Sequence, residues 1–244
     1  AGSGRGLDSH RRMEKRMNKV LLVIPAYNEE KNIERVVERL IREFPQFDYL
    51  VVNDGSKDGT AAICREKGYN LLDLPVNLGL AGSFQAGMRY AYQKGYGYAI
   101  QFDGDGQHRP EYIASMKEKM DQGYDIVIGS RFIVGKKDWS MRMIGSRLIG
   151  AAVYLTTGAR LTDPTSGMRL FSRKMIKEFA LNLNYGPEPD TVSFLIKQGA
   201  KVAEVPVTID ERTEGESYLK PLTAAYYMAR MLLSILFVQN FRKR

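Results

Sequence analysis

The sequence predicts an α/β fold in which a mostly parallel sheet carries helices on both faces. Short apolar runs of strand length alternate along the chain with longer segments whose apolar residues recur at helical spacing. Glycine or proline closes most of these segments, and polar loops follow the apolar runs. With 244 residues, of which 44% are hydrophobic, the chain is long enough to bury a sizeable core.

The first half of the chain alternates regularly between the two kinds of segment. An apolar run without polar alternation indicates a strand that is covered on both faces. Helices are recognised by apolar residues at helical spacing and by a Gly or Pro at one end. These criteria predict strands at residues 20–24, 49–52, 69–72, 98–102 and 126–128, and helices at 33–44, 58–68, 80–94 and 110–123.

The second half is less regular and ends in an apolar helix. Further helices are expected at residues 141–157 and 190–198, with short strands at 168–171 and within 201–208. The final helix, at 222–237, falls short of the ~20 apolar residues that span a bilayer. We interpret it as an amphipathic, membrane-proximal helix that lies on a membrane or docks on a membrane partner. A buried core helix is the alternative.

Composition sets the expected domain boundaries. Residues 1–16 are interpreted as a tag or leader without structure, 17–219 as the α/β domain, and 220–244 as the basic amphipathic C-terminal helix. The single cysteine, Cys64, excludes an internal disulfide and fits a reducing compartment.

The net charge of +8 is unevenly distributed. Residues 131–147 hold five basic side chains against one acid, and residues 219–244 hold five with no acid. Both segments adjoin an apolar helix, which indicates an anionic surface such as phospholipid or a polyprenyl phosphate. Nucleic acid is the rival ligand, but the chain has no recognition motif for it, so we expect none. A solvated basic face is the alternative without a ligand.

Two carboxylates one residue apart, Asp103 and Asp105, follow the apolar run at 98–102. The glycines beside them let the backbone turn sharply and let a ligand come close. Hard oxygen ligands at the end of a strand suit Mg²⁺ or Mn²⁺ bridging to phosphates, so an activated phosphorylated donor is expected. Taken alone, this triplet is also an ordinary turn.

Three other polar loops, at residues 25–29, 53–56 and 129–131, also follow expected strands. In doubly wound sheets, ligands bind outside the carboxyl ends of the strands. These loops are therefore expected to converge on Asp103 and Asp105, which is a stronger signal than any one motif.

The loops form an ordered set of motifs between residue 20 and about residue 220. They are Pro25-Ala26-Tyr27-Asn28-Glu29, Asn53-Asp54-Gly55-Ser56, Asn77-Leu78-Gly79, Asp103-Gly104-Asp105-Gly106-Gln107-His108, Gly129-Ser130-Arg131, Asp163-Pro164-Thr165-Ser166-Gly167 and Arg212-Thr213-Glu214-Gly215-Glu216-Ser217. This set resembles glycosyltransferase family 2, with the GT-A (Rossmann-like) fold. The dolichyl-phosphate mannose synthase-like, polyprenyl-phosphate branch is the most similar. The motifs are specific for sugar transfer and much less so for the sugar or the acceptor.

The resemblance implies a nucleotide-sugar site in the first half. Its residues would be Pro25, Ala26, Tyr27, Glu29, Asp54, Asn77, Gly79, Asp103, Gly104 and Asp105. Asp54 would accept a hydrogen bond from the base, with helix capping as the alternative. Leu80 stands where family members often have a basic residue, which puts a charged phosphate contact from that loop in doubt.

The resemblance also implies a metal site formed by Asp105, Asp103 and Gln107, holding Mg²⁺ or Mn²⁺. The ion would neutralise the diphosphate as the sugar leaves. His108 is expected to be structural, or to donate a hydrogen bond to a phosphate, rather than to act as a base.

Acceptor and phosphate contacts are implied for Arg131, Ser166, Arg212, Ser217 and Lys220. A guanidinium such as that of Arg131 binds two phosphate oxygens at once. Tyr218 stands where the family often has Lys, so the identity of the second cation is open.

The acceptor decides whether a base is needed. A sugar hydroxyl needs one, and Glu188 and Asp190 are the candidates. Acidic residues that stabilise a helix N-terminus are the alternative interpretation of both. A lipid monophosphate is already ionised and needs cations instead. With both acceptors kept open, the expected catalytic set is Asp103, Asp105, Arg131, Glu188 and Asp190.

The expected activity is inverting, metal-dependent transfer of a hexose from a UDP- or GDP-sugar to a polyprenyl phosphate resembling undecaprenyl phosphate. It would take place at the cytoplasmic face of the cell membrane. The family's extra C-terminal membrane spans do not occur in this sequence, so two alternatives are considered: a small membrane-protein partner, or a C-terminus that has been trimmed. The alternatives are sugar transfer to a cell-wall or capsular polysaccharide, and a non-catalytic nucleotide-sugar-binding subunit of a membrane complex.

Overall fold

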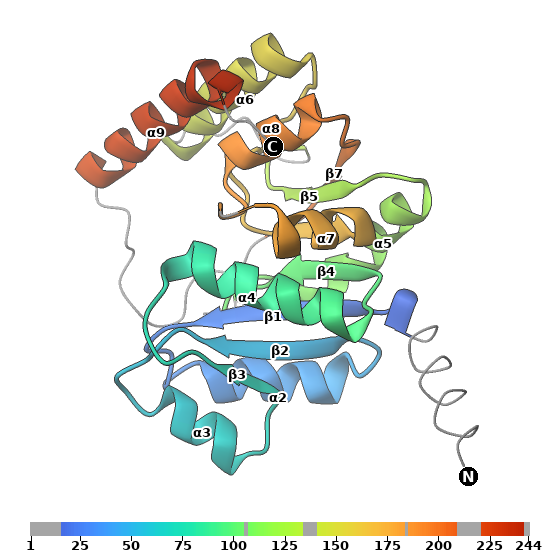
Figure 1. The fold of residues 1–244 in the computed structure, drawn as a ribbon, viewed down its shortest axis with the longest axis vertical. Coiled ribbons are helices and arrows are strands. Elements are labelled where there is room, and N and C mark those ends of the chain that lie inside the picture. The colour runs from blue at the N-terminus through green and yellow to red at the C-terminus, as the bar shows by residue number, and fades with distance from the viewer. Residues whose placement is uncertain (1–15, 105–106, 134–140, 184, 209–220, 242–244) are drawn as a thin grey trace.

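The computed structural model describes residues 16–104, 107–133, 141–183, 185–208 and 221–241 (Figure 1). One seven-stranded sheet runs through this part of the chain, in the order β3-β2-β1-β4-β6-β5-β7. The strands are β1 (Val20–Ala26), β2 (Asp48–Asn53), β3 (Leu71–Asp73), β4 (Tyr98–Gln101), β5 (Ile126–Ser130), β6 (Arg169–Ser172) and β7 (Val202–Pro206).

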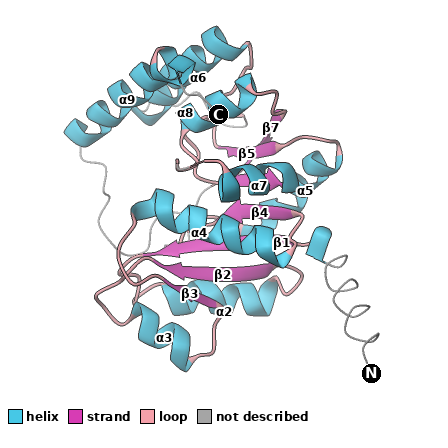
Figure 2. Ribbon diagram, viewed as in Figure 1, coloured by secondary structure: helices cyan, strands magenta, loops and turns pink. Residues whose placement is uncertain are grey.

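Helices lie in front of and behind this sheet (Figure 2). They are α2 (Ile33–Glu43), α3 (Thr60–Glu66), α4 (Gly79–Lys94), α5 (Ile113–Asp121), α6 (Met141–Thr157), α7 (Arg173–Leu181), α8 (Pro189–Lys197) and α9 (Pro221–Leu236). Short 3-10 turns, η1 (Pro110–Tyr112) and η2 (Val238–Phe241), precede α5 and follow α9. The predicted α/β class is confirmed.

The sheet is parallel except at β6, which runs antiparallel to both of its neighbours, β4 and β5. This reversal matters for the site. Because β6 runs the other way, the turn that leads into it lies at the same edge as the carboxyl ends of β4 and β5.

A hydrophobic core fills the space on each face of the sheet. Leu22 and Ile24 of β1 belong to the core that includes α2 and α5. Leu21 and Val23 belong to the core under α4, α7 and α8. Side chains of a strand alternate between faces, so a continuous apolar run fills both cores, as the sequence predicted.

Helix α7 was not expected from the sequence. It follows β6 without a loop and buries Met175, Ile176 and Phe179, which have helical spacing. Its first residue, Arg173, donates hydrogen bonds to the carbonyls of Ala91 and Tyr92 near the end of α4. A cation at the C-terminal end of a helix is favourable, so this contact joins α7 to α4.

Helices α6 and α9 lie side by side at one end of the molecule (Figure 1). A small third core joins them and includes Ile149, Val153, Met231 and Ile235. One side of α9 is therefore buried, as the core-helix interpretation predicts, while its other side exposes apolar side chains such as Tyr226 and Leu233. Contact of this exposed side with a membrane stays a prediction. No helix in the described part of the chain has the length and hydropathy of a membrane span.

Candidate functional site

The polar loops after β1, β2, β4 and β5 meet at one edge of the sheet. Parallel pairing joins β1 to β2 and to β4, which places the residues after Ala26, Asn53 and Gln101 side by side. The turn at 163–167 reaches the same edge through the reversed strand β6. The convergence predicted for the loops is therefore present.

The first two loops are hydrogen-bonded into one unit. Asn28 adopts a positive φ of 56°, which is uncommon for a residue other than glycine. Its side-chain Oδ1 accepts from the Lys57 N–H at 2.9 Å, and its own N–H donates to the Ser56 hydroxyl at 3.0 Å. The Glu29 N–H donates to the Thr60 hydroxyl at 2.9 Å. These contacts hold the expected nucleotide-binding loops together.

The side chains expected to contact the nucleotide differ in accessibility. Ala26 is buried at the end of β1, and its carbonyl accepts from the Asp54 N–H at 2.8 Å, whereas Tyr27 is 36% exposed. A ligand contact of Ala26 stays a prediction. Glu29 accepts a hydrogen bond from the Asn32 amide at 2.9 Å. Pro25 lies within β1, because the strand continues past the proline at which it was expected to stop.

Asp54 is 3% exposed and faces the start of α4. Its Oδ1 accepts from the N–H of Leu78, the N-cap residue of that helix, at 2.7 Å. Helix stabilisation, the alternative to a base contact, is therefore present, and the base contact stays a prediction. Asn77 accepts from the Gly79 N–H at 3.0 Å, so this loop has its own turn.

Asp103 lies after β4 and is held by His108. The Asp103 N–H donates to Nδ1 of His108 at 3.1 Å, and the His108 Nε2 lies 3.3 Å from Oδ2 of Asp103. His108 is 3% exposed, as expected for a structural imidazole, and its role stays a prediction. Asp105 lies outside the described residues, whereas Gln107 is described and partly exposed on the same loop.

Asp103 alone gives a limited test of the expected metal site. Among the described residues, no group of three or more His, Cys, Asp or Glu side chains could hold a metal ion. The Asp103 side chain is 35% exposed, and its Oδ1 has no partner in the described part of the chain. A partly exposed carboxylate at a sheet edge fits a hard cation, with Asp105 as the second carboxylate.

Arg131 forms a two-pronged ion pair with Asp163. Nε lies 2.6 Å from Oδ2 and Nη2 lies 2.8 Å from Oδ1, while Thr165 accepts from Nη2 at 3.0 Å. Burial alone would raise the pKa of Asp163, but the hydrogen bonds and charge of Arg131 hold it below its ordinary value. One edge of the guanidinium is thus occupied. A phosphate contact through the remaining Nη1 stays a prediction.

Ser166 does not have the accessibility that its predicted role requires. Its side chain is fully buried, and its hydroxyl accepts from the Met168 N–H at 3.3 Å. The hydroxyl stabilises the turn that leads into β6. The predicted contact with an acceptor phosphate is therefore not available in this conformation.

The two candidate bases are engaged by helix α9. Glu188, the N-cap residue of α8, accepts from the hydroxyl of Tyr227 at 2.5 Å. Asp190, which is 6% exposed, accepts from the hydroxyl of Ser234 at 2.6 Å. Both carboxylates lie at the start of α8, as the alternative interpretation predicted. A base role for either one stays untested.

Arg169 is a charged residue for which no role was predicted from the sequence. It is 3% exposed, and its Nη2 donates to the Pro164 carbonyl at 2.8 Å. Burial lowers the pKa of Arg169, whereas the charge of Glu188 raises it. Its Nε has no partner among the described residues. An arginine at the start of an apolar strand was the signal that could have identified it.

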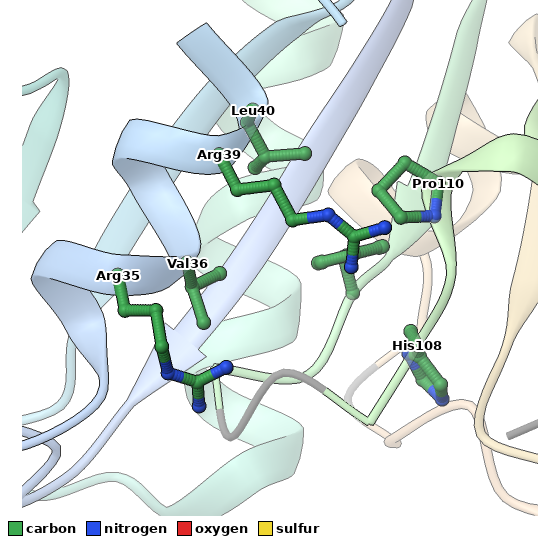
Figure 3. A pocket seen from close by; sticks show the side chains of 7 residues that line it. Arg35, Val36, Arg39, Leu40, His108 and Pro110 are labelled. Carbon is green, nitrogen blue, oxygen red and sulfur yellow. The ribbon is translucent and has the colours of Figure 1, made fainter. Parts of the chain in front are cut away.

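The remaining acceptor-loop residues, Arg212, Ser217 and Lys220, lie outside the described residues. A cavity of about 20 Å³ lies between α2 and the segment that holds His108 and Pro110 (Figure 3). It has room for about one water molecule and is too small for a nucleotide. Its lining residues are Arg35, Val36, Arg39, Leu40, Phe102, His108 and Pro110.

A sheet of this order, with converging loops at its carboxyl edge and Asp103 after β4, is a GT-A-type fold. The chain belongs to glycosyl transferase family 2, whose family model matches residues 21–180. A polyprenol monophosphomannose synthase from Mycolicibacterium smegmatis is 31% identical over 82% of this chain and 80% of that protein. An undecaprenyl-phosphate mannosyltransferase from Micrococcus luteus is 32% identical over 82% of this chain and 86% of that protein. The protein is a glycosyltransferase.

The solved structures agree on the fold. A glucosyl-3-phosphoglycerate synthase from Mycobacterium tuberculosis was solved with Mn²⁺, UDP and glucosyl-3-phosphoglycerate. It matches with a TM-score of 0.69 and 17% identity, and the match covers 100% of this chain and 86% of that chain. At this identity, the likeness concerns the fold alone.

Proposed function

We propose that the protein transfers a hexose from a UDP- or GDP-sugar to a polyprenyl phosphate at the cytoplasmic face of the cell membrane. One observation carries the choice of acceptor. Glu188 and Asp190 both accept hydrogen bonds from α9, and a polyprenyl phosphate needs no base because it is already ionised. The names of the relatives from M. smegmatis and M. luteus support the same acceptor class.

The donor would bind where the loops after β1, β2 and β4 meet. Asp103, together with Asp105 and Gln107, would hold Mg²⁺ or Mn²⁺. When bound, the ion would stabilise the charge of the departing diphosphate. The joined loops at 27–30 and 56–60 would place the nucleotide, because their hydrogen bonds already fix their relative position.

Transfer with inversion would need no proton movement. An oxygen of the lipid phosphate forms a bond to the anomeric carbon as the bond from that carbon to the diphosphate breaks. The nucleoside diphosphate leaves with the bonding electrons. Arg131, held by Asp163, would direct its Nη1 edge toward a phosphate, and Arg212 and Lys220 are proposed as further cations.

Helices α6 and α9 are proposed to contact the membrane surface. They expose Leu148, Leu155, Tyr226 and Leu233, with exposed fractions of 52, 78, 72 and 59%, and Phe237, directly after α9, is 60% exposed. Arg147 and Arg230 are exposed on the same helices, and neither helix contains an acidic residue. An apolar and cationic surface fits anionic phospholipid. The alternative is that a small membrane protein docks on this surface. Binding to protein-free vesicles would distinguish lipid contact from this alternative.

A radiolabelled transfer assay tests the proposal. The protein, Mn²⁺ and undecaprenyl phosphate would be incubated in turn with labelled UDP-glucose, UDP-N-acetylglucosamine and GDP-mannose. We expect label that extracts into butanol and is released by mild acid. Label on an added saccharide acceptor would contradict the lipid acceptor. Nucleotide-sugar binding without turnover on any acceptor would favour a non-catalytic binding subunit.

A further inference from the structure

His108 is a buried polar side chain in the loop after β4, outside the set of residues that would touch the substrates. It is 3% exposed. One side of its ring packs edge-on to Phe102, with 5.7 Å between ring centroids. The imidazole also lines the cavity in Figure 3, opposite Arg35 and Arg39 of α2. A buried imidazole needs partners for both of its nitrogens.

Both partners come from one residue, Asp103. Nδ1 accepts the Asp103 backbone N–H at 3.1 Å, so in the neutral ring the proton is assigned to Nε2. That nitrogen lies 3.3 Å from Oδ2 of the Asp103 carboxylate. The imidazole therefore contacts the backbone and the side chain of the same residue, and fixes their relative orientation.

A second loop restricts the pair from the other side. A Cβ atom added at Gly167 would lie 3.6 Å from both Oδ2 of Asp103 and Nε2 of His108. The turn before β6 thus passes close to the contact and limits the space into which the Asp103 side chain could rotate. The other carboxylate oxygen, Oδ1, has no partner in the described part of the chain, and the side chain is 35% exposed.

We propose that His108 is a positioning residue for the metal of the donor site. Its Nε2, 3.3 Å from Oδ2 of Asp103, would hold that side of the carboxylate so that Oδ1 stays available to a cation. Hydrogen-bond partners of metal-ligating carboxylates typically contribute 10–100-fold to metal affinity. The inference rests on the proposed function, because it takes Asp103 as a donor-site ligand.

Three substitutions separate the two contacts. His108→Leu fills similar space but removes both of them. His108→Asn keeps an acceptor near the Nδ1 position, and His108→Gln places an amide donor near the Nε2 position. Because the contact with the carboxylate orients the metal ligand, we expect the Leu variant to lose roughly 10–100-fold in Mn²⁺ affinity. The Gln variant should recover most of that loss, and the Asn variant less.

Mn²⁺ binding is measured on the full chain by the EPR signal of the free ion, with saturating UDP and, separately, GDP. Thermal unfolding is recorded for each variant. Tyr69→Phe is the matched control, because it removes the 2.7 Å hydrogen bond that the hydroxyl of this buried tyrosine donates to Glu38. This hydrogen bond lies on the face of the sheet that α2 covers. We expect this control to lower Tm without changing Mn²⁺ affinity.

The outcomes separate this inference from the proposed function. Failure of the unmodified protein to bind Mn²⁺ with either nucleotide overturns both. If the unmodified protein binds and the Leu variant binds equally well, only the role of His108 is overturned. The same holds if Gln recovers no more affinity than Leu, or if Tyr69→Phe loses as much affinity as His108→Leu.

Discussion

Tyr227 of α9 donates its hydroxyl to Glu188 at the start of α8 at 2.5 Å. The pKa of Tyr227 is raised by burial and by the charge of Glu188, so the phenol stays protonated and remains a donor. Further along α9, the hydroxyl of Ser234 donates to Asp190 in a second contact of the same kind. Helix α9 is thereby attached to the segment in which a catalytic base had been expected.

Tyr227→Phe is expected to destabilise the protein by about 1–3 kcal/mol, because it leaves the Glu188 carboxylate without its hydroxyl donor. The adjacent Tyr226 is 72% exposed and provides the control. Urea unfolding of both variants checks this prediction. Equal stabilities for Tyr227→Phe and Tyr226→Phe would show that the contact contributes nothing.

Glu188→Gln is expected to retain turnover with a lipid phosphate to within a few-fold. The amide keeps an acceptor for Tyr227, and an ionised acceptor needs no base. A true general base would contribute ~10²–10⁴-fold. Initial rates at saturating donor decide between the two, and a loss of that size would restore Glu188 as the base. Asp190→Asn gives the parallel measurement at the second carboxylate.

The ion pair of Arg131 and Asp163 predicts a pH-dependent stability. The folded-state pKa of Asp163 is depressed, so its contribution is complete above the unfolded-state pKa of about 3.9 and is lost as pH falls toward the folded-state value. The stability difference between the unmodified protein and Asp163→Asn should therefore shrink from pH 6 to pH 3, as measured by urea unfolding. Asp121→Asn, in an exposed pair with Lys117, is expected to change stability little at any pH.

Gly55→Ala tests how closely the loops of the donor site approach each other. Gly55 has a φ of +65°, and an added Cβ would lie 2.7 Å from the backbone nitrogen of Asn77. Gly68 has a φ of +67° but no atom within 4 Å of such a Cβ. Gly68→Ala should therefore lower the free energy of unfolding by about 1 kcal/mol, from backbone conformation alone. Gly55→Ala should cost more and also weaken UDP or GDP binding, as calorimetry would show. Equal effects of the two changes would contradict the close approach.

Leu155→Glu and Leu233→Glu are expected to reduce sedimentation with vesicles that contain anionic phospholipid. Both side chains are more than half exposed, so a carboxylate there should affect lipid contact more than folding. Leu181→Glu is the control, because Leu181 is 57% exposed but lies on α7. Unchanged sedimentation of the α6 and α9 variants would argue against lipid contact and favour a protein partner.

The sheet and its loops could be predicted because their signals are local. Val20 to Ile24 reads as a buried strand from its own composition, and parallel pairing then requires the loops after β1, β2 and β4 to meet. Helix α7 was missed because its apolar residues, such as Met175 and Phe179, are few and stand among charged ones. Its attachment to α4 through Arg173 depends on carbonyls more than 75 residues earlier in the sequence.

The sequence alone determined the α/β class, the family motifs and the edge at which Asp103 and the donor loops would gather. Hydrophobic periodicity and the alternation of strands and helices along the chain predict the class and the edge, and both patterns, like the motifs, can be recognised in contiguous residues. Only the tertiary structure decided which polar groups were already engaged. Ser166 is buried, Arg131 is paired with Asp163, and Glu188 binds a hydroxyl from α9. These pairings join residues far apart in the chain, and the accessibility of a charged group depends on what folds against it.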